Sequence, residues 1–227
     1  LMPARVNAII RTQQNELYGG SDNGLWHFDE TKQQLVQLDS AQRANSTQWQ
    51  NVRDVVSVPD GSLWLGLWQN GLMRWDKSGK HQFWLQDMAQ QKIGDAVQVV
   101  QEIQGKIWIG TRYSGVFVLE PKTGQLQSLA DRVAVEKAVD IQCLAQGPDQ
   151  TVLICSRNGL LSLDMQNSLV SGLGNAVQLA ETELLGAYTD KQKNIWLFSS
   201  QGLSLKPYQQ ERLITFTEQD GLNNREM

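Results

Sequence analysis

The side chains with the most evident chemistry are aromatic and cationic, and most of them fall in short loops after apolar strands. Trp68 follows one such strand, Arg112 and Tyr113 follow another, and Arg157 follows a third, while Arg53 lies just inside the start of a strand. Guanidinium groups bind carboxylates, and aromatic rings pack well against sugars. The set therefore predicts a site for a saccharide or a carboxylate. Arg112 and Tyr113 are its strongest members, because both are costly to expose without use.

Side chains for catalysis do not converge anywhere in the sequence. The two histidines, His27 and His81, fall in the expected third and fourth strands of different repeats, away from the arginine-bearing loops. No Ser-His-Asp or Cys-His arrangement is visible, and no pair of acidic residues recurs in those loops. We therefore predict that the protein is not an enzyme and has no catalytic residue, no metal site and no cofactor. A lyase or hydrolase is the less favoured alternative.

The two cysteines, Cys143 and Cys155, fall in neighbouring predicted strands of one repeat. Two buried thiols are the favoured interpretation. A disulfide between them is the alternative, because a bond between adjacent strands is geometrically awkward. Two cysteines in the whole chain predict neither a disulfide scaffold nor a zinc site.

A repeat of roughly 45 residues positions all of these side chains. Glycine recurs at the start of the third strand of each copy, and a large apolar residue recurs at the centre of the second strand. The two columns are Gly24, Gly71, Gly115, Gly159 and Gly202, and Tyr18, Trp64, Trp108, Leu153 and Trp196. Each copy contains four short strands separated by turns, which in the second copy are 52–58, 62–67, 71–76 and 81–86.

Four antiparallel strands in each repeat predict an all-β fold, a β-propeller of four-stranded antiparallel blades. Five blades are expected in this chain, at approximately 1–45, 46–91, 92–135, 136–180 and 181–227. They form either a closed five-blade ring or, as the favoured alternative, part of a larger ring. No long helix is predicted, and only residues 130–138 could form one or two helical turns.

The strand order predicts which face of the propeller binds. If the first strand of each blade is innermost, the loops between the second and third strands share a face with the linkers that enter the first strands. These loops and linkers are longer and more varied than the turns on the other face, as recognition loops on a rigid scaffold are. The large apolar residues at the centres of the second strands, here called the Trp64 column, are predicted to fill the core between blades. The mouth of the channel is predicted to be lined by Asn7, Arg53, Gln98 and Gln142.

Two stretches resemble the two-component regulator propeller repeat, whose second strand carries Gly-x-Ile/Leu-Trp-Ile/Leu-Gly. They are Asp60-Gly61-Ser62-Leu63-Trp64-Leu65-Gly66 and Gly105-Lys106-Ile107-Trp108-Ile109-Gly110-Thr111, with a partial match at Lys193-Asn194-Ile195-Trp196-Leu197. The segment Asp220-Gly221-Leu222 is similar to the family's lead-in between blades. The resemblance is weakest where Tyr18 replaces Trp in the first copy, and where Leu153 and Cys155 replace Trp and Gly in the fourth.

This resemblance implies the sensor region of a membrane-bound bacterial receptor, with a histidine kinase or a diguanylate cyclase elsewhere in the parent protein. It implies a periplasmic domain that senses an unknown small molecule and is attached to the membrane only through other parts of that protein. No kinase or cyclase motif is present in this sequence. A protein-interaction or dimerisation propeller is the alternative, and a homodimer is left open.

The composition fits one globular domain without a surface for nucleic acid. The 227 residues are 41% hydrophobic and 19% charged, with a formal net charge of −4, which gives no electrostatic footprint for nucleic acid. No apolar run approaches the ~20 residues of a membrane span. Residues 1–6 and 222–227 occupy equivalent places in the repeat, and Leu1 is not a natural start. We therefore expect a piece of a longer receptor chain that holds whole repeats.

Overall fold

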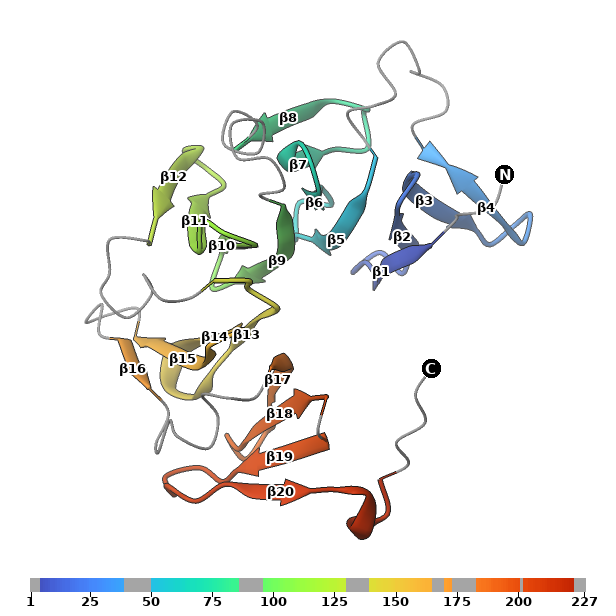
Figure 1. Ribbon diagram of the computed structural model, residues 1–227. Helices are drawn as coiled ribbons and strands as arrows, with labels where there is room; N and C mark the ends of the chain where they lie inside the picture. The colour runs from blue at the N-terminus through green and yellow to red at the C-terminus, as the bar shows by residue number, and fades with distance from the viewer. Residues whose placement is uncertain are drawn as a thin grey trace. The chain divides into compact units, whose positions relative to one another are not determined.

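Five four-stranded sheets make up the regular structure of the chain (Figure 1). The computed structural model describes residues 5–38, 50–85, 96–129, 139–164, 170–172, 183–200 and 202–222. Within these ranges the helical segments are two short 3-10 turns, Pro148–Gln150 and Glu218–Asp220, and none is long and apolar enough to cross a membrane. The all-β prediction is confirmed. The helical turns predicted at 130–138 lie outside the described residues.

Each sheet contains four strands that are consecutive along the chain and paired in chain order. The first sheet holds β1 (Val6–Arg11), β2 (Leu17–Ser21), β3 (Gly24–Asp29) and β4 (Gln34–Gln37). The second holds β5 (Val52–Ser57), β6 (Leu63–Leu67), β7 (Gly71–Trp75) and β8 (His81–Trp84). The third holds β9 (Val97–Ile103), β10 (Lys106–Thr111), β11 (Val116–Glu120) and β12 (Gln125–Ser128). The fourth holds β13 (Cys143–Gln146), β14 (Thr151–Ser156), β15 (Gly159–Asp164) and β16 (Val170–Gly172), and the fifth β17 (Leu184–Thr189), β18 (Ile195–Ser199), β19 (Gly202–Lys206) and β20 (Ile214–Phe216).

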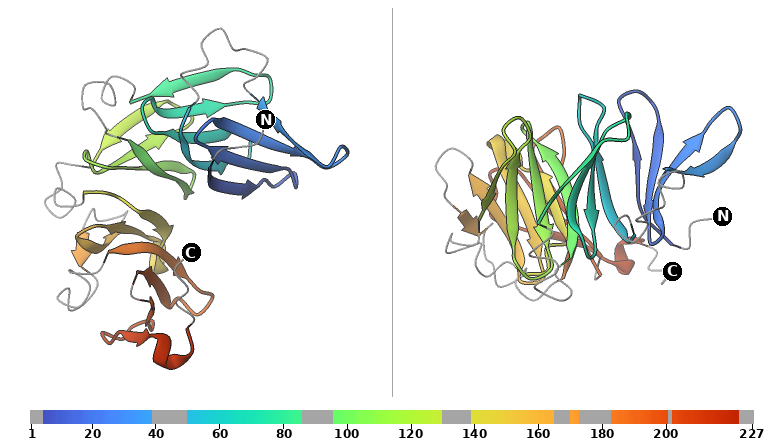
Figure 2. Two further views of the ribbon diagram at one scale, coloured as in Figure 1. Left: turned by 45° about the vertical axis from the view of Figure 1, so that its right-hand side comes forward. Right: turned by 90° about the horizontal axis from the view of Figure 1, so that it is seen from above.

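The chain divides into two compact units, residues 1–114 with 119–125 and residues 115–118 with 126–227. Within the first unit, the β1–β4 sheet lies beside the β5–β8 sheet (Figure 2). There β1 contacts β5, and β5 contacts β9, so successive sheets meet through their first strands. Within the second unit β13 contacts β17 in the same way. The sheets thus have the strand order and the first-strand contacts of propeller blades.

The aromatic column lies in the core of the first unit, as predicted. Tyr18, Trp64 and Trp108 are buried, and Leu153 is buried at the equivalent place in the second unit. Trp64 lies in β6 on the same face as Gly66, and that face packs against β9 of the following sheet. Its indole lies beside Trp84 of its own sheet, with 5.1 Å between ring centroids. These residues therefore form scaffold, and they are not available to stack on a ligand.

The glycine two residues after the aromatic position allows adjacent sheets to approach closely. A Cβ atom on Gly20 would lie 2.6 Å from Cγ1 of Val52, the first residue of the next first strand. A Cβ atom on Gly66 would lie 2.8 Å from the equivalent Cγ1 of Val97. Neither distance is compatible with carbon–carbon packing, which begins near 3.5 Å. The repeat therefore needs glycine at this position so that the next first strand can lie directly on the second strand.

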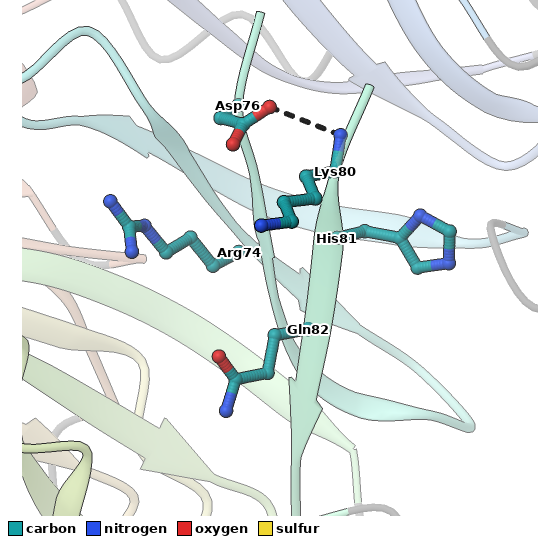
Figure 3. Close-up of a pocket in the computed structure, with 5 residues that line it drawn as sticks. All are labelled: Arg74, Asp76, Lys80, His81 and Gln82. Carbon is teal, nitrogen blue, oxygen red and sulfur yellow. Dashed lines mark hydrogen bonds between the residues drawn. The ribbon is translucent and has the colours of Figure 1, made fainter. Parts of the chain in front are cut away.

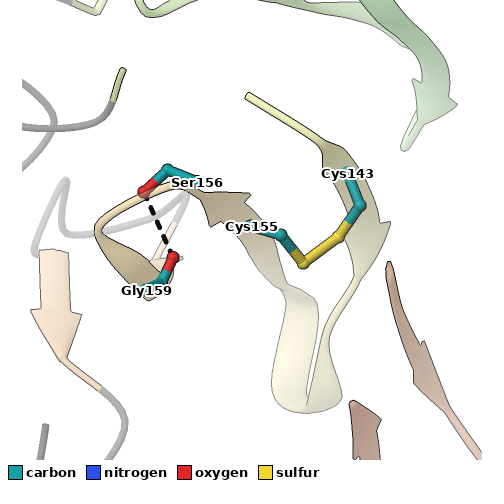
Figure 4. The surroundings of a disulfide bond; sticks show 4 residues. All are labelled: Cys143, Cys155, Ser156 and Gly159. Atoms are coloured by element: carbon teal, nitrogen blue, oxygen red, sulfur yellow. Dashed lines mark hydrogen bonds between the residues drawn. A yellow bond between two sulfur atoms is a disulfide. The ribbon is translucent and has the colours of Figure 1, made fainter. Parts of the chain in front are cut away.

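The expectation of two free thiols is wrong, because Cys143 and Cys155 form a disulfide (Figure 4). The two residues face each other directly in the β13–β14 ladder, and their Cα atoms are 4.8 Å apart. That separation falls within the range that a disulfide can bridge. The sequence placed the two cysteines on neighbouring strands but did not give the register that makes them direct partners. Cys155 also occupies the position that glycine holds in the earlier repeats.

Candidate ligand-binding site

The loops that follow the second strands are fixed by hydrogen bonds to the segments that enter the first strands. In four of them, the first loop residue donates its backbone N–H to a carbonyl one to four residues ahead of a first strand. These bonds join Asp22 to Arg5 (3.2 Å), Trp68 to Asn51 (3.0 Å), Arg112 to Ala96 (3.0 Å) and Arg157 to Val139 (3.2 Å). The prediction that these loops share a face with the linkers is therefore confirmed at these contacts. The loops have short, defined anchors and can hold side chains in place.

A β-bulge places Arg53 at this end of its sheet. In the β5–β6 ladder Val52 pairs with Leu67 and Asp54 pairs with Gly66, which leaves Arg53 without a partner on β6. A bulge of this kind redirects the side chain of the extra residue. The same irregularity recurs at the second residue of three further first strands, which are Asn7, Gln98 and Leu185. In four of the five sheets the repeat thus supplies one redirected side chain at the end of the first strand where the sequence predicts the channel mouth, whereas the β13–β14 ladder has a regular register.

Four of the five predicted ligand residues meet in one cluster within the first unit. The Arg53 guanidinium carbon lies 4.9 Å from the centroid of the Trp68 ring, and the Arg112 guanidinium carbon lies 5.4 Å from it. Arg112 also lies over Tyr113, at 5.2 Å. We call Arg53, Trp68, Arg112 and Tyr113 the arginine–aromatic cluster. Arg157 belongs to the second unit, where it is exposed.

The cluster is accessible, and no carboxylate of the described residues neutralises its positive charge. Tyr113 is 51% exposed, and the other three residues are partly exposed. Among the described residues, neither Arg53 nor Arg112 forms an ion pair, and neither guanidinium donates a hydrogen bond. Each guanidinium therefore keeps its N–H donors available beside an aromatic ring. Contacts of this type contribute about 0.5–1 kcal/mol at exposed sites.

The acidic residue next to Arg53 is engaged in hydrogen bonds to the backbone. The Asp54 carboxylate accepts the backbone N–H groups of Val55 at 2.9 Å and of Val100 at 2.8 Å, and the second bond joins β5 to β9. Burial of this carboxylate raises the pKa of Asp54 to about 6, although the residue as a whole is only partly buried. Asp54 belongs to no motif of the sequence. Its only signal is an acidic residue inside an apolar first strand.

Two other polar residues near this end are already paired. Asn7 was predicted to line the channel mouth, but its amide donates to the Asp22 carboxylate and to the Val52 carbonyl, both at 3.0 Å. The second bond reaches the next sheet, so Asn7 links two sheets. This role explains its place in the bulge better than contact with a ligand does.

A separate hollow of about 420 Å³ lies on the β7–β8 hairpin and was not predicted (Figure 3). Its lining residues are Arg74, Asp76, Lys80, His81 and Gln82. Figure 3 shows the His81 ring pointing away from the side chains of Arg74 and Gln82. Arg74 is neutralised by Asp60, with 2.7 Å between Nη2 and Oδ2. The Arg74 guanidinium of this hollow is therefore less available to a ligand than the guanidinium groups of the arginine–aromatic cluster.

The histidines lie where the sequence placed them, His27 in β3 and His81 in β8. The His27 ring packs on Tyr18, with 4.8 Å between ring centroids. In the described part of the chain, no three His, Cys, Asp or Glu side chains are grouped so that they could hold a metal ion.

The sheets and their first-strand contacts define the class as propeller-like, and solved structures share this fold. No protein-family model matches the sequence, and no curated protein matches it. The extracellular domain of the proposed one component system BT4673 from B. thetaiotaomicron is similar over 92% of this chain and 28% of that chain, with 22% identity and a TM-score of 0.74. The extracellular domain of the proposed hybrid two component system BT3049 from the same organism is similar over 94% of this chain and 30% of that chain, with 19% identity and a TM-score of 0.74.

An enzyme also shares the fold. Streptogramin B lyase is similar over 96% of this chain and 70% of that chain, with 9% identity and a TM-score of 0.67. At these identities the likeness establishes the fold alone. This chain spans less than a third of the length of the two extracellular domains.

Proposed function

We propose that this chain is the ligand-sensing propeller of a membrane-bound bacterial signalling receptor, belongs to the two-component regulator propeller type, and is not itself catalytic. The repeat motif around Trp64 and Trp108 supports this proposal, as does the fold shared with extracellular domains of one- and two-component systems. Such a domain works outside the cytoplasm, and we place this one in the periplasm. Attachment to the membrane and the kinase or cyclase output belong to other parts of the receptor.

The observation that carries the proposal is the arginine–aromatic cluster. Its side chains come from two repeats, on β5 and on the loops after β6 and β10, and converge at the face where the linkers enter. A cluster that has no neutralising partner among the described residues and lies on a rigid sheet scaffold fits a binding site better than a structural one. The ligand is a small molecule, either a saccharide or a carboxylate. Arg157 is the corresponding candidate in the second unit. We propose no cofactor.

Titration with glucuronate and with glucose tests this role, using thermal shift and NMR as the two readouts. Arg112→Ala removes the guanidinium that contacts both rings and should abolish binding without lowering the melting temperature of the free protein. Arg11→Ala is the matched control, since Arg11 is an exposed arginine that pairs with Glu30 and Asn15 in the first sheet. Equal affinity of wild type and Arg112→Ala for a bound probe would remove the site assignment. If neither glucuronate nor glucose binds to the wild-type protein, that result would argue against a saccharide or a carboxylate as the ligand.

A protein-interaction or dimerisation role is the second candidate, and exposed apolar side chains favour it. On the β17–β20 sheet Tyr188 is 58% exposed and Phe198 is 46% exposed, and on the β1–β4 sheet Ile9 is 70% exposed. Apolar side chains gathered on one face often mark an interface. Sedimentation velocity over a range of concentrations tests this role, because self-association that Tyr188→Ser or Ile9→Ser weakens would support it. A monomer at all concentrations would exclude dimerisation.

A further inference from the structure

We infer that the ligand of the arginine–aromatic cluster is a carboxylate, and that Arg53 and Arg112 bind it together. This inference rests on the proposed ligand-binding role of the cluster and decides between the two ligand classes left open above. Three features of the cluster carry it: the cations that lie over its aromatic rings, the absence of an ion pair to either guanidinium among the described residues, and the Trp68 ring that the two arginines share.

The aromatic rings of the cluster already have cations stacked on them. Arg112 lies over both Trp68 and Tyr113, and Arg53 lies over Trp68 as well. A neutral sugar is usually recognised by packing of its ring against a free aromatic face. Here guanidinium groups lie over the rings, so the rings are less available to pack against a sugar. The groups best placed to meet a ligand are therefore the N–H edges of the two arginines.

The two arginines differ from Arg11 and Arg74 of the same unit because neither has an acidic partner among the described residues. Arg11 lies 3.8 Å from a Glu30 oxygen, and Arg74 lies 2.7 Å from an Asp60 oxygen. Within the described ranges, no carboxylate lies within ion-pair distance of Arg53 or Arg112. The acidic neighbour Asp54 is committed to the backbone N–H groups of Val55 and Val100. An external anion would supply the missing counter-charge.

The two guanidinium groups share the Trp68 ring, which limits the distance between their positive charges. Both guanidinium carbons are near the centroid of the same indole, so they are at most about 10 Å apart. Like charges at this distance repel each other, and an anion that touches both relieves the repulsion. A planar guanidinium donates two parallel hydrogen bonds to a carboxylate, which favours this group over a neutral hydroxyl. The anchored loops and the bulge hold the donors in place before the ligand arrives.

Glucuronate and glucose form the matched probe pair, because they differ only in the carboxylate at C6. NMR titration would follow the Trp68 indole N–H and the arginine Nε–H signals of the whole chain. We expect saturable binding of glucuronate and none of glucose at the same concentrations. Arg53→Gln and Arg112→Gln should each weaken glucuronate binding at least about tenfold, since each removes a charge-assisted contact. Arg11→Gln removes one positive charge elsewhere in the unit and should leave the affinity unchanged.

The outcomes separate this inference from the proposed function. Binding of glucose as tightly as glucuronate, with loss of both in Arg112→Gln, would overturn the carboxylate assignment and keep the ligand-binding face. Glucuronate affinity that is equal in wild type, Arg53→Gln and Arg112→Gln would overturn the cluster as a site altogether. The absence of glucuronate binding to wild type would also overturn the carboxylate assignment. Weaker binding as salt rises from about 0.05 to 0.5 M would support it, because exposed charge pairs are screened.

Discussion

Two adjacent glycines of β2 allow a direct test of how the sheets pack. Gly20 faces the β5–β8 sheet, and a Cβ atom there would lie 2.6 Å from Val52 Cγ1, 3.2 Å from Val52 Cβ and 3.3 Å from its carbonyl oxygen. Gly19 faces the opposite side, where the nearest atom to a Cβ would be the Ala8 carbonyl oxygen at 3.7 Å, an ordinary contact. Alanine at Gly20 should therefore push two sheets apart, whereas alanine at Gly19 should fit.

The structure sets the size of each effect. Val52 is fully buried, and its carbonyl accepts the Asn7 amide, so it cannot move without breaking that bond. The new methyl at Gly20 requires a shift of about 1 Å to reach normal carbon–carbon contact. Overpacking of this kind lowers the free energy of unfolding by about 1–3 kcal/mol. At Gly19, loss of chain entropy in the unfolded state should raise it by about 0.4–1 kcal/mol.

Thermal and urea unfolding, followed by far-ultraviolet circular dichroism, would compare wild type, Gly19→Ala and Gly20→Ala. A difference of about 1.4–4 kcal/mol between the two variants corresponds to roughly 3–16 °C in melting temperature for a chain of this size. Equal stability of the two variants would refute the packing of β5 directly on β2. Destabilisation by Gly19→Ala alone would show that the faces of β2 are assigned the wrong way round.

Three further predictions concern the core, the disulfide and pH. Trp108→Ala should lower the free energy of unfolding, measured by urea denaturation, by about 3–5 kcal/mol. Trp196→Ala should lower it clearly less, because Trp196 is only half-buried. Equal losses in the two variants would contradict the assignment of Trp108 to the core. Replacing Cys143 and Cys155, which are 12 residues apart, with alanine should cost about 2–3 kcal/mol, and a reducing agent should then have no further effect on the melting temperature. The pKa of Asp54 is about 6, above the value of about 3.9 for an unfolded aspartate, so its stabilising effect is complete below pH 4 and is lost as pH rises through 6. Wild type should therefore lose up to roughly 3 kcal/mol relative to Asp54→Asn between pH 4 and pH 7, and parallel pH profiles of the two proteins would refute this effect.

The sequence predicted the sheets well because their signals are local and repeated. In the second repeat, the predicted strands 52–58, 62–67, 71–76 and 81–86 differ by no more than two residues from β5, β6, β7 and β8. Alternating apolar residues and turn residues act within a few positions, and five copies average out chance. The Trp64 column could be assigned to the core for the same reason, since a large apolar residue that recurs with the strands is best explained by packing.

The site was predicted only as a list of loop residues, because its contacts depend on two sheets meeting. The sequence indicated that Trp68 and Arg112 lie in equivalent loops of successive repeats. It did not indicate that Arg112 would reach back to the ring of Trp68, or that a bulge would bring Arg53 to the same ring. The Cys143–Cys155 bond escaped prediction for a related reason, since a shift of one residue in register would have separated the two sulfur atoms onto opposite faces.

The fifth sheet carries a large side chain at the position where the first three sheets have glycine and the fourth has Cys155. Gly20 and Gly66 leave room for the next first strand, and the equivalent residue of β18 is Phe198, which is 46% exposed. The cross-strand partner of Phe198 is Gly186, where a Cβ atom would lie 3.4 Å from the phenyl ring, so the ring extends over a residue without a side chain. A first strand could not lie on β18 as closely as β5 lies on β2 unless the ring moved. A propeller that closes or continues across this face must therefore hold its next strand further out or displace Phe198.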